Sequence, residues 1–393
     1  MTEFLVRHFV KDYEAVEKSA VRTAYGVLAS MVGIVCNVFL FLVKFIVGLL
    51  LHSVSVTADA FNNLSDAGSS FVTLIGFKLA GAKPDPDHPF GHGRIEYVSG
   101  LIVSGVILLM AFELIKNSVD KIIHPTEVEF SLLAMGILVA SILVKIYMYF
   151  YNQQISKKID SAAMKATAVD SLSDTLATTV VLIAAIVAKY TGLQVDGYCG
   201  VLVGLFIFYA GFSAAKDTLD PLLGQPAEPE FVERIEEIVN GYDMVLGIHD
   251  LVVHNYGPGR VMISLHAEVP ADEDILKIHD MIDIIENDLK EQLHCEAVIH
   301  MDPLVVNDEQ TNELRTAVKE IVESFEGSVS MHDFRTVIGP THTNMIFDVL
   351  VPFDYPMTDA QVKEKVQAEV WERLGKEYYT VIQIDRPYTA MKK

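Results

Sequence analysis

Four polar side chains lie in two stretches that otherwise read as membrane-spanning. Asn62 and Asp66 are four residues apart in "ADAFNNLSDAGSS", and Asp170 and Asp174 are four apart in "AVDSLSDTL". Residues four apart lie on one face of a helix, so two such helices can close a four-oxygen cation site between them. Ionisable groups at bilayer depth are costly and usually functional. The alternative is that these residues pack helices together or lie outside the membrane. Asp59 precedes Asn62 by three residues on the same side of the helix. We expect it to contact the metal ligands and not the metal itself.

A second cluster lies in the loop "KPDPDHPFGHGRIEYVSG". Asp85, His88 and His92 gather there between prolines and glycines, with Asp87 as a further candidate. Imidazole and carboxylate groups at short spacing are suitable ligands for a divalent cation. The alternative is a solvated loop whose histidines bind nothing.

Further histidines mark the second half of the chain. The candidate ligands there are His249, His266, His279, His300 and Asp302. The sequence does not place them in one pocket, so surface histidines are an equal alternative to metal ligands.

Six apolar windows approach the length that crosses about 30 Å of hydrocarbon. They cover residues 24–51, 54–80, 95–119, 130–152, 164–190 and 196–215. We therefore expect six transmembrane helices, with both ends of the chain on one side. The basic residues that flank the spans favour the cytoplasm for that side. The mixed, charged start of the chain reads as a cytoplasmic leader rather than a signal peptide.

The charge divides the chain into two halves. The net charge is −22, and from Pro221 onward 33 acidic side chains stand against 14 basic ones. This acidic half would repel nucleic acid and is compatible with divalent cations. The three cysteines are far apart and show no CxxC spacing, which indicates neither a disulfide framework nor a thiolate zinc cluster.

The acidic half contains one pattern twice. A helix–strand–strand–helix–strand order follows the Pro-rich break "LDPLLGQPAEPE", and it returns with matched HD, GP, VP and DP landmarks. This order suits a small ferredoxin-like layer of helices on an antiparallel sheet. We expect three domains: a six-helix membrane domain over residues 1–220, an α+β domain over 221–305 and its second, degenerate copy over 306–393.

The second copy keeps only part of the histidine set. His332 matches His249 and Asp385 matches Asp302, whereas Asp348 and Gln383 replace His266 and His300. We therefore expect the second copy to contribute little to metal binding.

Taken together, these motifs resemble those of the cation diffusion facilitator family of divalent-metal/proton antiporters. The resemblance covers roughly residues 10–303 and rests on "ADAFNNLSD", "DPDHPFGHGRIE", "VDSLSD" and "GIHDL…SLHAEV…IHDMID…VIHMDP". It implies a six-helix membrane domain, a cytoplasmic metallochaperone-like domain and a homodimer. The repeated domain lies outside the common family architecture but is similar to one in some manganese-exporting members.

The resemblance also assigns the sites. It implies a transport site, a loop site and a cytoplasmic site at the dimer interface, and a charge pair between the third and sixth helices at Arg94 and Asp220. The implied ligands are Asn62, Asp66, Asp170 and Asp174 for transport, Asp85, His88 and His92 for the loop, and His249, His266, His279, His300 and Asp302 for the cytoplasmic domain.

The ligand chemistry indicates the metal. An amide oxygen and three carboxylates form a hard site that suits Mn²⁺, whereas Zn²⁺ prefers imidazole or thiolate; zinc-transporting members of the family usually place a histidine in this quartet. Carboxylates bind protons and cations competitively, which allows exchange of metal for protons. We expect Mn²⁺ export by proton antiport from a bacterial plasma membrane, with Zn²⁺, Fe²⁺ or Co²⁺ as alternative cargo. The metal is expected to act as substrate and regulator, without an organic cofactor.

Other functional classes lack residues or need different behaviour. The sequence has no GKS or GKT phosphate loop and no HExxH motif, so neither ATP-driven pumping nor metalloproteolysis is indicated and we expect no enzyme. A membrane metal sensor and a channel remain alternatives. A sensor would leave the metal content of the cell unchanged, and a channel would conduct without a proton gradient.

Overall fold

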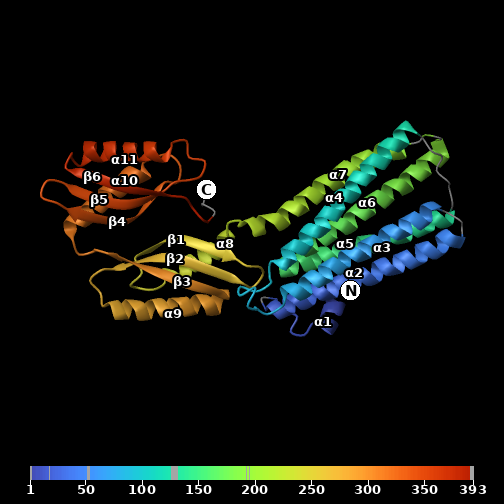
Figure 1. The fold of residues 1–393 in the computed structure, drawn as a ribbon, viewed down its shortest axis with the longest axis horizontal. Coiled ribbons are helices and arrows are strands. Elements are labelled where there is room, and N and C mark those ends of the chain that lie inside the picture. The colour runs from blue at the N-terminus through green and yellow to red at the C-terminus, as the bar shows by residue number, and fades with distance from the viewer. Residues whose placement is uncertain are drawn as a thin grey trace. The chain divides into compact units, whose positions relative to one another are not determined.

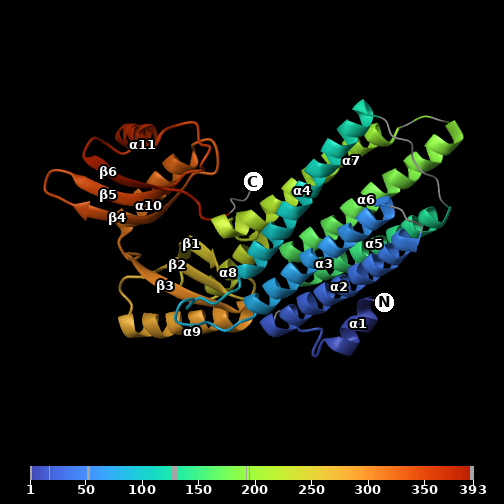
Figure 2. The same ribbon diagram turned by 45° about the vertical axis from the view of Figure 1, so that its right-hand side comes forward.

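The computed structural model describes residues 2–16, 18–50, 54–124, 132–191, 193 and 195–389. The chain forms two compact units. The helical unit comprises Met1–Gln225 with Tyr256–Arg260, and the sheet unit comprises Pro226–Asn255 with Val261–Lys393. Figures 1 and 2 show long helices in the first unit and two helix-covered sheets in the second.

Long helices, together with the short α1, build the helical unit. They are α1 (Thr2–Phe9), α2 (Ser19–Leu50), α3 (Val54–Ala80), α4 (Ile95–Ile123), α5 (Leu132–Ile159), α6 (Ala162–Thr191) and α7 (Asp196–Leu223). Among the described residues, five stretches are long and apolar enough to cross a membrane. They are Ser19–Leu50, Ile95–Ile123, Met135–Ile159, Ala162–Thr191 and Gly197–Leu223. The chain is therefore an integral membrane protein.

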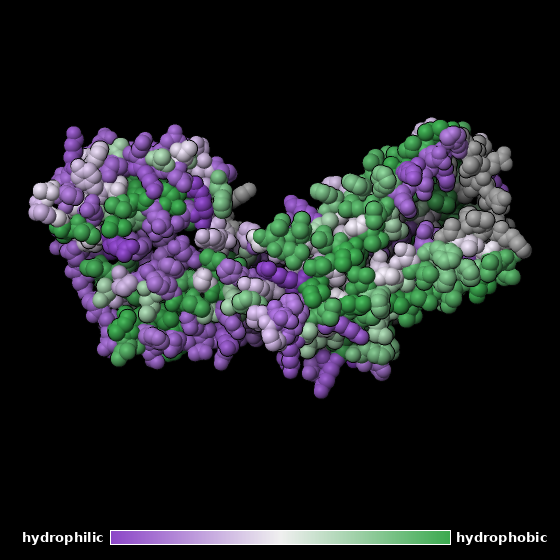
Figure 3. All heavy atoms as spheres, viewed as in Figure 1, coloured by the Kyte–Doolittle hydropathy of each residue, from purple (hydrophilic) through white to green (hydrophobic). Residues whose placement is uncertain are grey.

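The expected count of six spans is not confirmed by this measure. α3 forms as a helix but is not among the five, and its sequence carries Asp59 and Asp66 as well as two asparagines. Figure 3 shows hydrophobic residues over most of the visible face of the helical unit and mainly hydrophilic residues over the sheet unit. Large apolar side chains such as Leu109 and Leu202 point outward, as expected of surfaces that face lipid.

Small residues let the helices approach closely. α4 contacts α3, α6 and α7, and α5 packs against α6. A Cβ atom added to Gly100 of α4 would lie 2.9 Å from the Cα of Ala163 in α6. Such contacts are typical of membrane helices, where packing replaces the hydrophobic effect as the force between helices.

A buried ion pair ties three parts of the helical unit together. The Arg22 guanidinium in α2 binds the Glu96 carboxylate at the start of α4. It also donates to the carbonyl oxygens of Ile159 (2.8 Å) and Asp160 (2.9 Å), in the turn between α5 and α6. The Ser161 hydroxyl donates to Glu96 as well, at 2.5 Å. The pair therefore has hydrogen-bond partners on both sides, as a buried charge pair requires.

The sheet unit contains the repeated element order. The first copy consists of α8 (Pro229–Val239), β1 (Gly247–Asn255), β2 (Val261–Pro270), α9 (Ile275–Leu293) and β3 (Cys295–Leu304). The second consists of α10 (Glu309–Glu323), β4 (Ser330–Ile338), β5 (Thr343–Leu350), α11 (Asp359–Arg373) and β6 (Tyr378–Asp385). Each copy has its own apolar core between its helices and one face of its sheet.

The two sheets are mixed, which corrects the expectation of an antiparallel sheet, and the ferredoxin-like fold is not confirmed. In the described part of each copy the strand order is β1-β2-β3 or β4-β5-β6. The first pair of each sheet is antiparallel and the second pair is parallel. The reason lies in the connections: a hairpin reverses the chain between the first two strands, whereas a helix carries it back so that the third strand runs parallel to the second.

α7 carries a proline in its last turn, at the Pro-rich break where we expect the membrane domain of residues 1–220 to end. That domain boundary stays a prediction. The structure continues α7 through Pro221 to Leu223. Gly224 then ends the helix with a positive φ of 94°, a conformation that glycine adopts without steric cost.

The ion pair between Arg22 and Glu96 yields a stability prediction. Replacing Glu96 by Ala leaves the buried guanidinium without its counter-charge, which should cost about 3–5 kcal/mol of folding free energy and lower the melting temperature of the detergent-solubilised protein. Lys165→Ala is the matched control, because its 2.6 Å bridge to Asp217 is half exposed and should contribute about 1 kcal/mol or less. Equal shifts for the two variants would contradict the proposed role of the buried pair.

Candidate functional site

Three carboxylates from two helices meet inside the helical unit. Asp66 of α3 and Asp170 and Asp174 of α6 each offer one oxygen, and these oxygens lie within 4.8 Å of one another. Asp66 and Asp170 are buried and Asp174 is partly buried. The four-residue spacing on α6 puts both of its aspartates on the face that meets α3. The structure therefore brings together the three charged members of the predicted quartet.

A lysine that the sequence analysis did not single out lies in this cluster. The Lys145 ammonium group of α5 is 2.7 Å from Asp66 Oδ2 and 2.5 Å from Asp174 Oδ2. The Lys145 side chain is 3% exposed. It therefore supplies a positive charge to the carboxylates at the place where a cation would bind.

The fourth predicted member lies differently. Asn62 is exposed, whereas the next residue, Asn63, is buried. The Asn63 amide donates to Asp66 Oδ2 at 3.3 Å. Residues three apart on a helix are neighbours as much as residues four apart, so spacing alone did not distinguish Asn63 from Asn62.

Asp59 pairs with a second buried lysine. Its Oδ2 lies 2.8 Å from the Nζ of Lys44 in α2, whose side chain is almost fully buried. This bridge joins α2 to α3, and Asp59 precedes Asp66 on the same helix. Asp59 therefore has a partner of its own.

The loop cluster forms as predicted from its spacing. Asp85 Oδ1 lies 3.2 Å from His88 Nδ1, Asp85 Oδ2 lies 3.3 Å from His92 Nε2, and the two imidazoles are 3.1 Å apart. Hydrogen bonding from the His88 backbone N–H holds the pKa of Asp85 below its usual value. All three side chains offer ligand atoms to one position.

Arg94 and Asp220, the expected charge pair, lie in α4's N-terminal cap and in α7. Within the helical unit, the Arg94 guanidinium lies 4.8 Å from the centre of the Tyr256 ring. A bridge between α6 and α7 is made by Lys165 and Asp217. The pairing of Arg94 with Asp220 stays a prediction.

The first copy of the sheet unit gathers four of its five predicted ligands. Asp302 Oδ2 lies 3.1 Å from His249 Nε2 and 2.8 Å from His266 Nδ1. His300 Nε2 is 3.4 Å from the other oxygen of Asp302, although its side chain is largely exposed. His279 lies on α9, where it pairs with Asp283, and this chain does not bring it to the cluster.

The second copy forms a comparable cluster. His332, Asp348 and Asp385 offer ligand atoms within 4.8 Å of one another. The substitutions at the positions of His266 and His300 therefore leave three potential ligands together.

The comparisons with known proteins agree with this arrangement. Residues 30–223 match the family profile described as the cation efflux transmembrane domain. An uncharacterized transporter of Methanocaldococcus jannaschii is 32% identical over 273 residues, which cover 69% of this chain and 96% of the relative. The chain belongs to the cation efflux family. These are the cation diffusion facilitators that the motifs resemble, and family members are transporters rather than enzymes.

Other matches refine this membership. Residues 227–304 and 311–387 each match the family's cytoplasmic domain profile. The manganese efflux system protein MneS of Bacillus subtilis is 26% identical over 280 residues, covering 71% of this chain and 96% of MneS. The cation-efflux pump FieF of Shewanella oneidensis is 25% identical over 280 residues, covering 71% of this chain and 94% of FieF.

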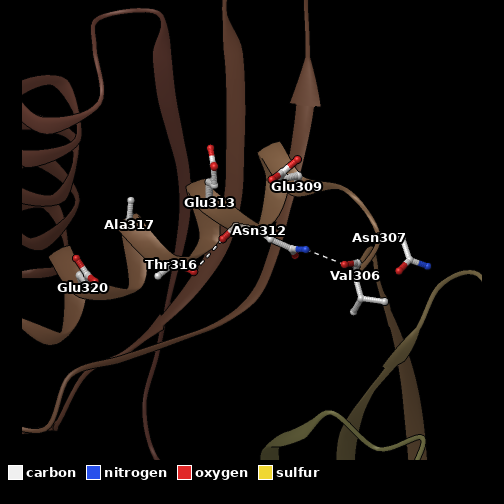
Figure 4. Close-up of a pocket in the computed structure, with 8 residues that line it drawn as sticks. All are labelled: Val306, Asn307, Glu309, Asn312, Glu313, Thr316, Ala317 and Glu320. Atoms are coloured by element: carbon white, nitrogen blue, oxygen red, sulfur yellow. Dashed lines mark hydrogen bonds between the residues drawn. The ribbon is translucent and has the colours of Figure 1, made fainter.

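A surface pocket is lined by residues that belong to none of these clusters. Figure 4 shows that its lining comes from α10 and the segment before it. The Asn312 amide donates to the carbonyl oxygen of Val306, and the Thr316 hydroxyl donates to the carbonyl oxygen of Asn312. Its lining residues hold no histidine, and we assign it no role. They are Val306, Asn307, Glu309, Asn312, Glu313, Thr316, Ala317 and Glu320.

Lys145 gives the first functional prediction. Lys145→Met leaves Asp66 and Asp174 without their positive partner, so the metal-free protein should lose about 3–5 kcal/mol of stability. Added Mn²⁺ should then raise its melting temperature more than that of the wild type, because the ion replaces the missing charge. Lys44→Met is the control, since Lys44 pairs with Asp59 outside the cluster. Equal Mn²⁺-induced shifts in all three proteins would show that Lys145 does not compete with metal.

The loop cluster gives the second. His88→Ala combined with His92→Ala should reduce metal transport several-fold without abolishing it, because the loop lies outside the carboxylate cluster. Transport into vesicles of equal protein content measures this effect. Complete loss in a normally folded double variant would instead make the loop an essential part of the pathway.

Proposed function

We propose that this member of the cation efflux family exports a divalent cation from the cytoplasm, with Mn²⁺ as the preferred cargo, in exchange for protons. The observation that carries the proposal is the buried meeting of Asp66, Asp170 and Asp174 between two helices. Carboxylates are rare inside membranes and mark ion pathways when they occur there.

The preference for Mn²⁺ rests on the donor atoms. The described cluster offers carboxylate oxygens, together with the amide group of Asn63 beside Asp66. Oxygen-rich sites suit Mn²⁺, whereas Zn²⁺ favours nitrogen and sulfur ligands. The similarity to MneS, named as a manganese efflux protein, supports this cargo. The similarity to FieF, a cation-efflux pump, keeps Fe²⁺, Zn²⁺ and Co²⁺ as alternatives.

The charges of the site support exchange with protons. Three ionised carboxylates and the Lys145 ammonium group carry a net charge of about −2 by the usual charges of these groups. One divalent cation or two protons would neutralise this charge. An uncompensated charge is costly in the bilayer interior. A site that binds either one divalent cation or two protons can therefore open to one side of the membrane and then to the other without carrying a net charge.

The assembly follows the family pattern in our proposal. α3 serves as a sixth span, its polar face turned to the transport path, which puts both chain ends in the cytoplasm of a bacterial cell. The match to the family's cytoplasmic domain supports a homodimer. The histidine clusters of the sheet unit would then bind cytoplasmic metal and regulate transport.

Alanine variants test the transport site. Asp66→Ala, Asp170→Ala and Asp174→Ala should each lower Mn²⁺ uptake into proteoliposomes by at least about 100-fold, since each removes a charged ligand equivalent to several kcal/mol. Uptake is measured under an imposed pH gradient and compared with Zn²⁺. Asp217→Ala is the control, because its partner Lys165 lies on the exposed side of α6. Wild-type uptake by any one variant would remove that residue from the proposed site.

The two asparagines can be separated by parallel substitutions. Asn63→His should raise Zn²⁺ transport relative to Mn²⁺, because it adds a nitrogen ligand beside Asp66. Asn62→His tests the ligand expected from the sequence. The variant that changes the metal ratio identifies the amide ligand, and an unchanged ratio in both would contradict the argument from hard oxygen ligands.

A further inference from the structure

The two copies of the sheet unit carry matching polar residues on matching strand positions. Side chains alternate between the faces of a strand, and the buried apolar residues of β2 and β5 face the helices. The polar residues between them lie on the other, helix-free face of each sheet. In the first copy these are His249, His266 and Asp302, and in the second they are His332, Asp348 and Asp385.

The helix-free faces meet inside the sheet unit. The ring of His249 in β1 lies 4.3 Å from the ring of His332 in β4, centre to centre. Asp250 Oδ1 of the first copy is 3.8 Å from His332 Nε2 of the second. Asp250 joins His249 and His332 in a single group of potential ligands. A cluster that belongs to both copies therefore exists within one chain.

Three buried atoms of this cluster have no hydrogen-bond partner. They are Nε2 of His249, Nε2 of His332, whose side chain is 10% exposed, and Oδ2 of Asp385. Buried polar atoms without a partner are uncommon and require an explanation. The His332 and Asp385 atoms lie 3.5 Å apart, beyond the reach of a good hydrogen bond.

The spacing of these atoms suits a shared ion. Ligand atoms at about 2.1 Å from a metal are roughly 3.0 Å apart at a right angle and roughly 3.4 Å apart at a tetrahedral angle. His332 Nε2 is 3.5 Å from Asp385 Oδ2 and 3.8 Å from Asp250 Oδ1. Each of these two pairs is within a small contraction of coordination distance, and His332 Nε2 is the atom they share.

Neighbouring groups orient these ligands. Gln383, which takes the position of His300, donates to Asp385 Oδ1 at 3.2 Å and leaves Oδ2 directed to His332. The Asp250 backbone has a positive φ of 50° at the irregular point of the β1–β2 ladder. Aspartate tolerates this conformation better than most residues. Partners of this kind commonly fix ligand orientation in metal sites.

Carboxylates crowd around His332. Asp250 of the first copy and Asp385 of the second each place an oxygen within 3.8 Å of its Nε2, and Asp348 belongs to the same group of potential ligands as Asp385. Like charges this close repel one another where water is excluded. A bound cation would offset that repulsion.

We propose that His332 and Asp385 of the second copy and Asp250 of the first bind one divalent cation, which cross-links the two copies within a single chain. Asp348 groups with His332 and Asp385, whereas Asp250 groups with His332 and His249, so His332 is the ligand common to both copies. This site is additional to the transport site and to the His249, His266 and Asp302 cluster. One imidazole with carboxylates suits Mn²⁺, Fe²⁺ or Zn²⁺. The inference uses the proposed function only to choose Mn²⁺ as probe.

Metal counting on the full-length protein tests the site. The parent carries Asp66→Asn, Asp170→Asn and Asp174→Asn, so that the transport site does not contribute. Bound Mn²⁺ and, separately, Zn²⁺ are measured by equilibrium dialysis and elemental analysis of the detergent-solubilised protein. His332→Ala and Asp385→Asn should each remove one ion per chain or weaken its binding by at least about tenfold. His342→Ala, an exposed histidine at the far end of the β4–β5 ladder, should remove none.

The link between the copies is tested by combining variants. Asp250→Asn and Asp385→Asn lie in different copies but should affect the same ion, so the double variant should lose one ion and not two. Full metal content in Asp385→Asn, or the loss of two ions in the double variant, would overturn the proposal. Asp385→Asn changes no side-chain volume appreciably, and its melting curve reports whether it folds.

The metal-binding measurements do not depend on transport activity. Mn²⁺ uptake is measured separately with the carboxylates of the helical unit intact. Failure of uptake with retained binding at His332 would contradict the proposed function alone. Normal uptake with no ion at His332 would contradict only the cross-link.

Discussion

Negative charge placed where water is excluded needs a positive partner, and much of this protein follows from that constraint. The carboxylates at Asp66, Asp170 and Asp174 lie among helices, where their ionised forms are expensive. The structure meets the cost with Lys145, which contacts Asp66 and Asp174. The same solution occurs where Lys44 binds Asp59. Each lysine comes from a different helix than its carboxylate, so charge balance also fixes which helices are neighbours.

The duplicated sheets show the same need for positive partners outside the helical unit. Each copy keeps its apolar residues under its helices and turns its acidic and imidazole groups to the opposite face. Where those faces meet, His249 and His332 lie ring to ring among carboxylates. The ion pairs that the structure describes at Asp250, Asp302 and Asp385 are all with histidines. In the helical unit a lysine balances the site, whereas in the sheet unit the balance falls to imidazole or to a bound ion.

The sequence predicted the parts that depend on periodicity and short spacing. The four-residue interval between Asp170 and Asp174 placed both on one helix face, and the Asp85, His88 and His92 loop closed as expected. The element order of both copies followed from alternating and helical patterns. The choice between Asn62 and Asn63 depended on the rotation of α3, which a single helix does not reveal.

Other features depend on the three-dimensional arrangement. A lone lysine in an apolar span was a usable signal for Lys145, but its partners come from two other helices. The parallel pairing of β2 with β3 follows from the helix between them, a constraint that the antiparallel expectation overlooked. The approach of Asp250 to His332 arises only when two sheets meet. No local pattern in the residues around Asp250 encodes that contact.

The short connection between the copies has a consequence for how they respond to metal. β3 ends at Leu304 and α10 begins at Glu309, so the two halves of the His332 site are tethered by a few residues. Tethering of this kind gives an effective local concentration on the order of millimolar, whatever the abundance of the protein. A site shared between separate subunits, by contrast, fills only as the subunits associate. Fusion of the second copy therefore makes the ion cross-link a property of each polypeptide, and its occupancy would report the free metal concentration without reporting the amount of transporter.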